Sequence, residues 1–190
     1  SPLLATATGA VAAAEYVIPK SLRFNPSDTP SLSKTFASAG NQRTWTWSGW
    51  VKRSSLATGG LFTCYTGVGN DSGYFNFGFD GSYKIIIGGW STGYLQTDAV
   101  FRDLSAWYHI VLAFDSTQAT QSNRIKLYAN GSQITSFSVA NYVSQNAELP
   151  INSANTHNVG ANVYYTNTQD KLDGYLADVQ FVDGQALAPT

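Results

Sequence analysis

The chain has 190 residues, of which 43% are hydrophobic and 14% aromatic, and its formal net charge is −1. Charged residues make up only 12%, about half of the usual share, and the 11 basic residues form no run, which argues against nucleic-acid binding. The apolar content excludes a disordered chain, and the sequence holds no apolar stretch of about 18 residues that would span a membrane.

The first 19 residues differ from the rest of the chain. They are small, apolar and weakly patterned, and they lack the basic start of a secretory signal. We expect residues 1–19 to form an extended arm that docks on another subunit; the alternative is an unstructured terminus. Residues 20–190 show neither a repeat nor a linker and are expected to form one domain.

From residue 21 onward, strand-like runs alternate with clusters of Gly, Asn, Asp and Ser that are typical of turns. No apolar stripe with the 3.6-residue period of a helix appears after residue 20. The predicted strands are residues 21–25, 32–36, 44–53, 60–66, 73–79, 83–88, 95–101, 107–115, 124–129, 133–137, 157–161 and 174–182.

Alternation within these runs predicts which side chains face the core, because successive side chains of a strand point to opposite faces. In the run 44–53 one face carries Trp45, Trp47, Gly49 and Val51, which leaves Trp50 on the outward face. The run 107–115 is apolar on both faces and is expected at the centre of a sheet. Further inward rows are expected at Phe75, Phe77 and Phe79 and at Ile125, Leu127 and Ala129.

The dipeptide Asn130-Gly131 between two predicted strands indicates a tight hairpin, because both residues tolerate a positive φ. About a dozen antiparallel strands with large inward side chains predict an all-β, two-sheet antiparallel sandwich.

The residues with catalytic potential argue against an enzyme. Ten of the 12 acidic residues are Asp, which is common in turns, and no predicted strand carries the pair of carboxylates that glycosidases use. His109 and His157 are the only histidines, and no nucleophile elbow accompanies them. Cys64 lies in an alternating apolar strand and is expected to be a buried structural thiol. We therefore expect no catalytic residues and no cofactor.

Three segments together resemble concanavalin A-like, laminin G-type jelly rolls. They are Thr44-Trp-Thr-Trp-Ser-Gly-Trp-Val-Lys52, the pair of runs 107–115 and 124–131, and the closing run 172–187. The amino-acid sequence of residues 21–25, 41–53 and 173–187 resembles that of a lectin-like domain of tailed-bacteriophage virion proteins. The resemblance implies that Asp178 occupies an acidic position of the closing strand and acts as a structural hydrogen-bond acceptor. It implies for His109 the role of a residue packed within the sheet.

The resemblance implies a non-enzymatic structural module of a bacteriophage virion, forming a capsid-surface, fibre or spike appendage. The alternative is a lectin-type adhesin that binds glycans on the host surface. The expected location is the virion surface, and the expected partners are other virion proteins, reached through the N-terminal arm, and further copies in a homo-oligomer. Fold alone does not decide between these functions.

Sugar binding calls for an exposed aromatic ring beside Asn or Asp side chains. The residues that fit this description are Trp50, Trp90, Tyr94, Tyr164 and Tyr165. Relatives of the resembled family often bind Ca²⁺ at the rim of the sandwich, and Ca²⁺ takes six to eight oxygen ligands. Candidate donors are Asp71, Asp98, Asp103, Asp170 and Asp173, for which turn capping is the alternative role.

Overall fold

The computed structural model describes residues 17–68, 73–89, 95–164 and 167–189. Within these ranges the only helical segments are two single-turn 3-10 helices, η1 (Pro26–Asp28) and η2 (Gln121–Asn123). Neither could cross a lipid bilayer. All other regular structure in the described ranges is antiparallel β-sheet, as the sequence predicts.

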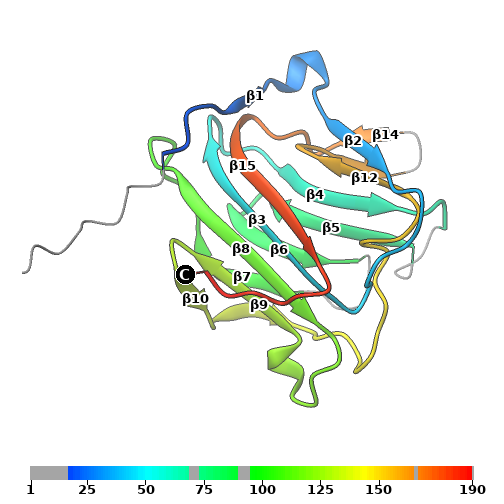
Figure 1. The fold of residues 1–190 in the computed structure, drawn as a ribbon. Coiled ribbons are helices and arrows are strands. Elements are labelled where there is room, and N and C mark those ends of the chain that lie inside the picture. Colours follow the sequence, from blue (N-terminus) through cyan, green and yellow to red (C-terminus); the bar gives the residue numbers. More distant parts are fainter. Residues whose placement is uncertain (1–16, 69–72, 90–94, 165–166, 190) are drawn as a thin grey trace, which may run out of the picture.

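Two large sheets stack face to face (Figure 1). The six-stranded sheet has the order β1 (Leu22–Phe24), β15 (Gly174–Asp183), β3 (Thr44–Arg53), β8 (Tyr108–Asp115), β9 (Ile125–Ala129) and β10 (Ser132–Ile134). The seven-stranded sheet has the order β11 (Phe137–Ala140), β7 (Leu95–Val100), β6 (Lys84–Gly88), β5 (Tyr74–Phe79), β4 (Gly59–Tyr65), β12 (Thr156–Val159) and β2 (Leu32–Thr35). A separate hairpin is formed by β13 (Asn162–Tyr164) and β14 (Asn167–Gln169).

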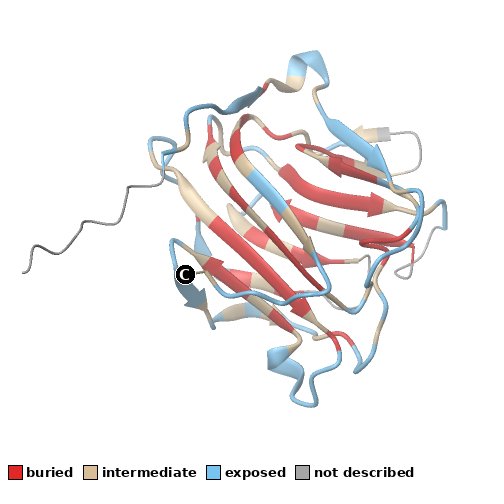
Figure 2. Cartoon of the chain, viewed as in Figure 1, coloured by how far each residue is buried: buried red, intermediate tan, exposed pale blue. Residues whose placement is uncertain are grey.

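The core between the sheets is aromatic, and Figure 2 shows the buried residues concentrated on the central strands. Trp45 and Trp47 of β3 are fully buried. The Trp45 ring meets the Phe75 ring edge-on at 5.8 Å, and the Trp47 ring meets the Phe77 ring edge-on at 5.1 Å. These edge-to-face contacts join the two sheets, because β3 and β5 belong to different layers.

The predicted facing of the strands is confirmed. The rows of β3, β5 and β9 lie in the core, and β8 lies between β3 and β9 in the middle of its sheet. Asn130 and Gly131 have φ values of 50° and 80°, as a two-residue hairpin turn requires. Cys64 is buried, and burial raises the pKa of its thiol to about 11.

One predicted strand is wrong. The run 133–137 was expected to be continuous, but the chain leaves the six-stranded sheet after β10 and joins the seven-stranded sheet as β11. Ile134 pairs with Leu127 of β9, whereas Phe137 pairs with Thr97 of β7. Alternation alone does not show this step, because it reports the face of a side chain and not the sheet to which the strand belongs.

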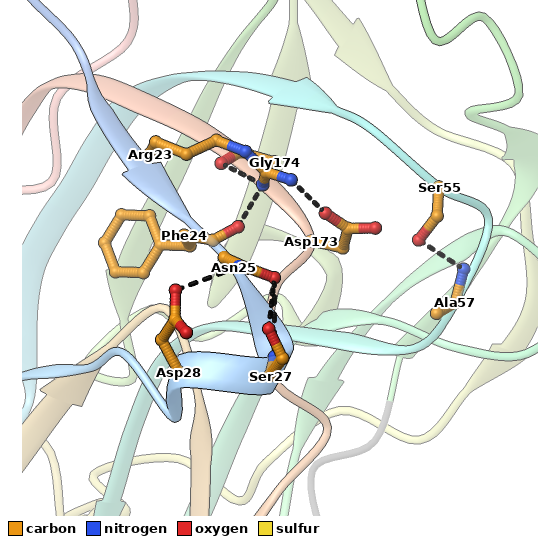
Figure 3. A network of polar contacts seen from close by, with 9 residues as sticks. All are labelled: Arg23, Phe24, Asn25, Ser27, Asp28, Ser55, Ala57, Asp173 and Gly174. Carbon is orange, nitrogen blue, oxygen red and sulfur yellow. Dashed lines mark hydrogen bonds and ion pairs between the residues drawn. The ribbon is translucent and has the colours of Figure 1, made fainter.

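Polar contacts hold the segments at the two ends of the described chain against the core strands. In Figure 3 the Arg23 guanidinium bridges from β1 to the start of β15: Nη2 lies 2.7 Å from Asp173 Oδ1, and Nη1 donates to the Gly174 carbonyl at 3.1 Å. Asn25 then caps η1, because its side-chain oxygen accepts from the Ser27 backbone N–H at 3.4 Å and also from the Ser27 hydroxyl at 3.0 Å. At the other end, Thr46 Oγ1 donates to the Gln185 carbonyl at 2.7 Å and holds the C-terminal segment on the outer face of β3.

Candidate functional site

A pocket of about 280 Å³ opens on the outer face of the seven-stranded sheet, the face turned away from the core. The β13–β14 hairpin forms one of its walls. We call it the tyrosine pocket, and its lining residues are Tyr74, Asn76, Ile86, Gly88, Gly89, Asn162, Tyr164, Gln169 and Asp170.

The strand pleat places the polar members of this lining on the outer face. Phe75 and Phe77 point into the core, so Tyr74 and Asn76, which alternate with them on β5, point outward. Gly88 of β6 pairs with Asn76 and leaves the floor of the pocket low. Gly60 of β4 lets the hairpin approach, since a Cβ there would lie 2.6 Å from both Ala161 C and Asn162 N.

A directional hydrogen-bond network fixes the hairpin wall. The Tyr74 hydroxyl donates to Asn162 Oδ1 at 2.6 Å, and Asn162 Nδ2 donates to Asp170 Oδ2 at 3.2 Å. The second carboxyl oxygen of Asp170 accepts from the Thr58 hydroxyl at 2.8 Å. Burial raises the pKa of Tyr74 to about 12, so its hydroxyl stays protonated and remains a donor.

Aromatic rings form the apolar part of the pocket. The Tyr164 ring packs at 4.9 Å from the Tyr65 ring and meets the Tyr74 ring nearly edge-on at 5.3 Å. Asn76 lies beside them, and its side-chain oxygen is buried without a hydrogen-bond partner in the described part of the chain. A buried acceptor without a donor costs about 1–3 kcal/mol, which a ligand hydroxyl or a bridging water would offset.

A second pocket of about 380 Å³ lies on the outer face of the six-stranded sheet. We call it the tryptophan groove, and it is lined by Ile18, Pro19, Lys20, Ser21, Trp50, Trp107 and Ala177. The Trp50 ring stacks on the His109 ring at 5.0 Å, and burial lowers the pKa of His109. This groove is apolar apart from Lys20 and Ser21, and its walls come partly from the segment before β1.

The five aromatic candidates from the sequence fall in different places. Tyr164 lies in the tyrosine pocket, whereas Trp50 lies in the tryptophan groove on the other sheet. Trp90, Tyr94 and Tyr165 lie outside the described residues, although Trp90 follows the lining residue Gly89 in the sequence and Tyr165 follows Tyr164.

The predicted calcium ligands do not form one cluster. Asp71 lies outside the described residues, and within the described ranges no three His, Cys, Asp or Glu side chains are grouped to hold a metal ion. Asp98, which sits in β7, accepts from the Ser136 hydroxyl at 2.5 Å. Asp103 accepts from the backbone N–H and the hydroxyl of Ser105. Asp173 pairs with Arg23, while Asp170 belongs to the tyrosine pocket.

Four polar lining residues were not found from the sequence: Tyr74, Asn76, Asn162 and Gln169. Asn162 and Gln169 flank the candidate Tyr164 and belong to a hairpin of two three-residue strands, which give too short an alternation to predict. Tyr74 and Asn76 lie almost ninety positions earlier, and only the pairing of β4 with β5 and the docking of the hairpin bring them close.

Two stacked antiparallel sheets with an aromatic core and a polar pocket on one outer face define a jelly-roll domain of the concanavalin A type. The chain belongs to the concanavalin A-like lectin/glucanase superfamily, whose laminin G-type family model matches residues 27–190. No curated protein sequence matches the chain significantly.

Solved structures share the fold at low sequence identity. A heptameric SAP-like pentraxin from Limulus polyphemus is 19% identical with a TM-score of 0.60, and the match covers 87% of this chain and 72% of the pentraxin. The CBM40 module of a Ruminococcus gnavus IT-sialidase, bound to α2,3-sialyllactose, is 13% identical with a TM-score of 0.54 and is covered to 94%, over 85% of this chain. NanB sialidase from Streptococcus pneumoniae is 13% identical with a TM-score of 0.61, and the match spans 88% of this chain but 26% of the sialidase.

Proposed function

We propose that this domain binds carbohydrate in the tyrosine pocket. The observation that carries the proposal is the meeting of Tyr74 and Tyr164 rings with the side-chain amides of Asn76, Asn162 and Gln169 in one pocket. The apolar face of a pyranose packs on an aromatic ring, while its hydroxyls exchange hydrogen bonds with amide groups. The R. gnavus module supports the proposal, because a similar fold there carries bound sialyllactose.

We propose further that the domain binds its glycan without hydrolysing it. Glycosidases flank the scissile bond with two carboxyl groups about 5–9.5 Å apart. Among the described residues that line the tyrosine pocket, Asp170 is the single carboxyl group, and both of its oxygens already accept hydrogen bonds. Incubation with the bound glycan should release no new reducing ends.

A glycan array of the purified chain tests the proposal. Tyr164→Ala should weaken binding about tenfold or more, since it removes a ring contact worth about 0.5–1.5 kcal/mol together with its buried area. Trp50→Ala is the matched control, because it removes an aromatic ring from the opposite sheet. Trp90→Ala, Tyr94→Ala and Tyr165→Ala test the remaining predicted aromatic residues. Binding that is unchanged in Tyr164→Ala but lost in Trp50→Ala would move the site to the tryptophan groove.

We also propose, from the sequence resemblance, that this domain belongs to a bacteriophage virion, as a structural appendage or as a host-glycan adhesin. The apolar tryptophan groove and the low charge of the chain favour contacts between subunits, because interfaces are enriched in aromatic residues and depleted of charge. The Limulus pentraxin is a heptamer, so a similar fold assembles in that protein. A stable monomer at micromolar concentration would contradict assembly of the isolated chain, and immunogold labelling of intact particles would test the virion location.

A further inference from the structure

The charge of the tyrosine pocket bears on which glycans it accepts. Its nine described lining residues include one acidic side chain, Asp170, and no Lys, Arg or His. Sugars that carry a carboxylate, such as the sialic acid of sialyllactose, are normally held by basic groups, above all by the planar guanidinium of Arg.

Lys84 and Lys171 are the basic residues within two sequence positions of a described lining residue, and both have partners outside the pocket. In the sequence, the stretches 90–94 and 165–166, which follow the lining residues Gly89 and Tyr164, contain no basic residue, and neither does 69–72, which ends two positions before Tyr74. Lys84 at the start of β6 donates from Nζ to the Ser138 hydroxyl at 2.9 Å, and Lys171, next to Asp170, reaches the Pro26 carbonyl at 3.4 Å. Both ammonium groups are thus directed to partners that do not line the pocket.

The hydrogen-bond roles in the pocket point the same way. The Tyr74 hydroxyl and one Asn162 N–H are spent as donors within the network. The lining groups left for a ligand include an acceptor, the Asn76 side-chain oxygen, which has no donor in the described part of the chain. Each oxygen of the Asp170 carboxyl accepts one hydrogen bond within the protein and keeps a second lone pair that a ligand hydroxyl can use. A sugar hydroxyl can donate to these acceptors, whereas a carboxylate can only accept.

We propose that the tyrosine pocket selects uncharged, hydroxyl-rich glycans and rejects glycans that present a carboxylate to it. This inference rests on the proposed function and gives its ligand class. It separates this domain from the R. gnavus module, which shares the fold but holds sialyllactose. The discriminating group is Asp170, whose carboxylate repels a second carboxylate in a lining with no basic residue among its described members.

Matched pairs of glycans, each neutral oligosaccharide with its sialylated counterpart, test this selection on one array. Lactose with α2,3-sialyllactose is one such pair, and the affinities of pairs that bind are then measured by calorimetry at low and high salt. We expect the sialylated member of each pair to bind at least about tenfold more weakly, and the gap to narrow at high salt, which screens like-charge repulsion.

Two variants attribute the selection to the pocket. Gln169→Arg places a guanidinium on the exposed lining residue of β14 and should raise affinity for the sialylated members. Asp170→Asn should narrow the gap within each pair, whereas Asp98→Asn, which removes the same charge from a carboxyl outside the pocket, should leave it unchanged.

The outcomes separate the two proposals. Equal or tighter binding of the sialylated members by the unmodified chain would overturn the selection while leaving carbohydrate binding intact. A preference for neutral glycans that neither Gln169→Arg nor Asp170→Asn alters would also overturn it, because the discriminating groups would lie elsewhere. If no glycan on the array binds, the proposed function itself fails.

Discussion

Replacing Gly60 by alanine should displace the β13–β14 hairpin, which forms one wall of the tyrosine pocket, from the strand β4 on which it packs. A Cβ at position 60 would stand 2.6 Å from Ala161 C and 2.6 Å from Asn162 N, closer than carbon atoms approach without displacement. The obstacle is backbone, so it cannot rotate away, and the β13–β14 hairpin must shift from β4. Overpacking of this kind costs about 1–3 kcal/mol, which for a chain of this size lowers the melting temperature by about 2–12 °C.

The same shift should weaken glycan binding, since Asn162 donates to Asp170 and accepts a hydrogen bond from the Tyr74 hydroxyl. Thermal unfolding and glycan titration therefore measure the variant together. Gly81→Ala is the control, because its Cβ would find Thr58 Cγ2 as its nearest neighbour at 4.0 Å. If Gly60→Ala melted within about 1 °C of this control and bound glycan equally well, the packing of the hairpin against β4 would be refuted.

Three further predictions follow from buried and capping groups. Cys64, whose pKa burial raises to about 11, should resist a thiol reagent at pH 8 in the folded chain and react fully in denaturant; fast native labelling would contradict its burial. Burial lowers the pKa of His157, and its Nε2 accepts from the Asn152 N–H at 2.9 Å, so the neutral ring is the one that fits. As the pH falls, His157 takes up a proton in the unfolded chain before it does so in the folded chain. The free energy of unfolding should therefore fall as pH drops below about 6.5, by at most about 1.4 kcal/mol per pH unit for this group. Urea unfolding of His109→Gln at pH 7.5 and 5.5 measures this effect, because the substitution leaves His157 as the one histidine of the sequence. Equal free energies of unfolding at the two pH values would contradict the reasoning. Calcium or EDTA should leave the melting temperature unchanged, because the described carboxylates are not grouped; a clear upward shift with calcium would revive a metal site.

Much of the fold could be predicted from the sequence because the alternation is strong where the core is large. In β3 the tryptophans at 45 and 47 are fully buried, so each must sit on the inward face, and the bounds Thr44–Arg53 match the prediction. Asn130-Gly131 was equally readable, since few other pairs adopt two positive φ values in a row.

The site was predicted only in fragments. Tyr164 and Asp170 were both singled out, but as members of two different hypotheses, sugar binding and calcium binding. The structure places them in one pocket with Tyr74 and Asn162, through contacts that depend on register and on Gly60. Trp50 was chosen because it faces outward, and it does, but outwardness does not report on which sheet a residue lies.

The two outer faces of the sandwich differ in chemistry, and this difference links the proposals. The outward side chains at the centre of the seven-stranded sheet include the polar residues Thr63, Asn76 and Gln96, whereas those of the six-stranded sheet include Trp50 and Val111. A polar face with an aromatic wall suits a ligand rich in hydroxyls, and the apolar tryptophan groove suits burial against protein. The C-terminal segment held by Thr46 covers another part of the outer face of the six-stranded sheet. A domain packed against other subunits through the six-stranded sheet would therefore keep the tyrosine pocket open to a glycan on its opposite side.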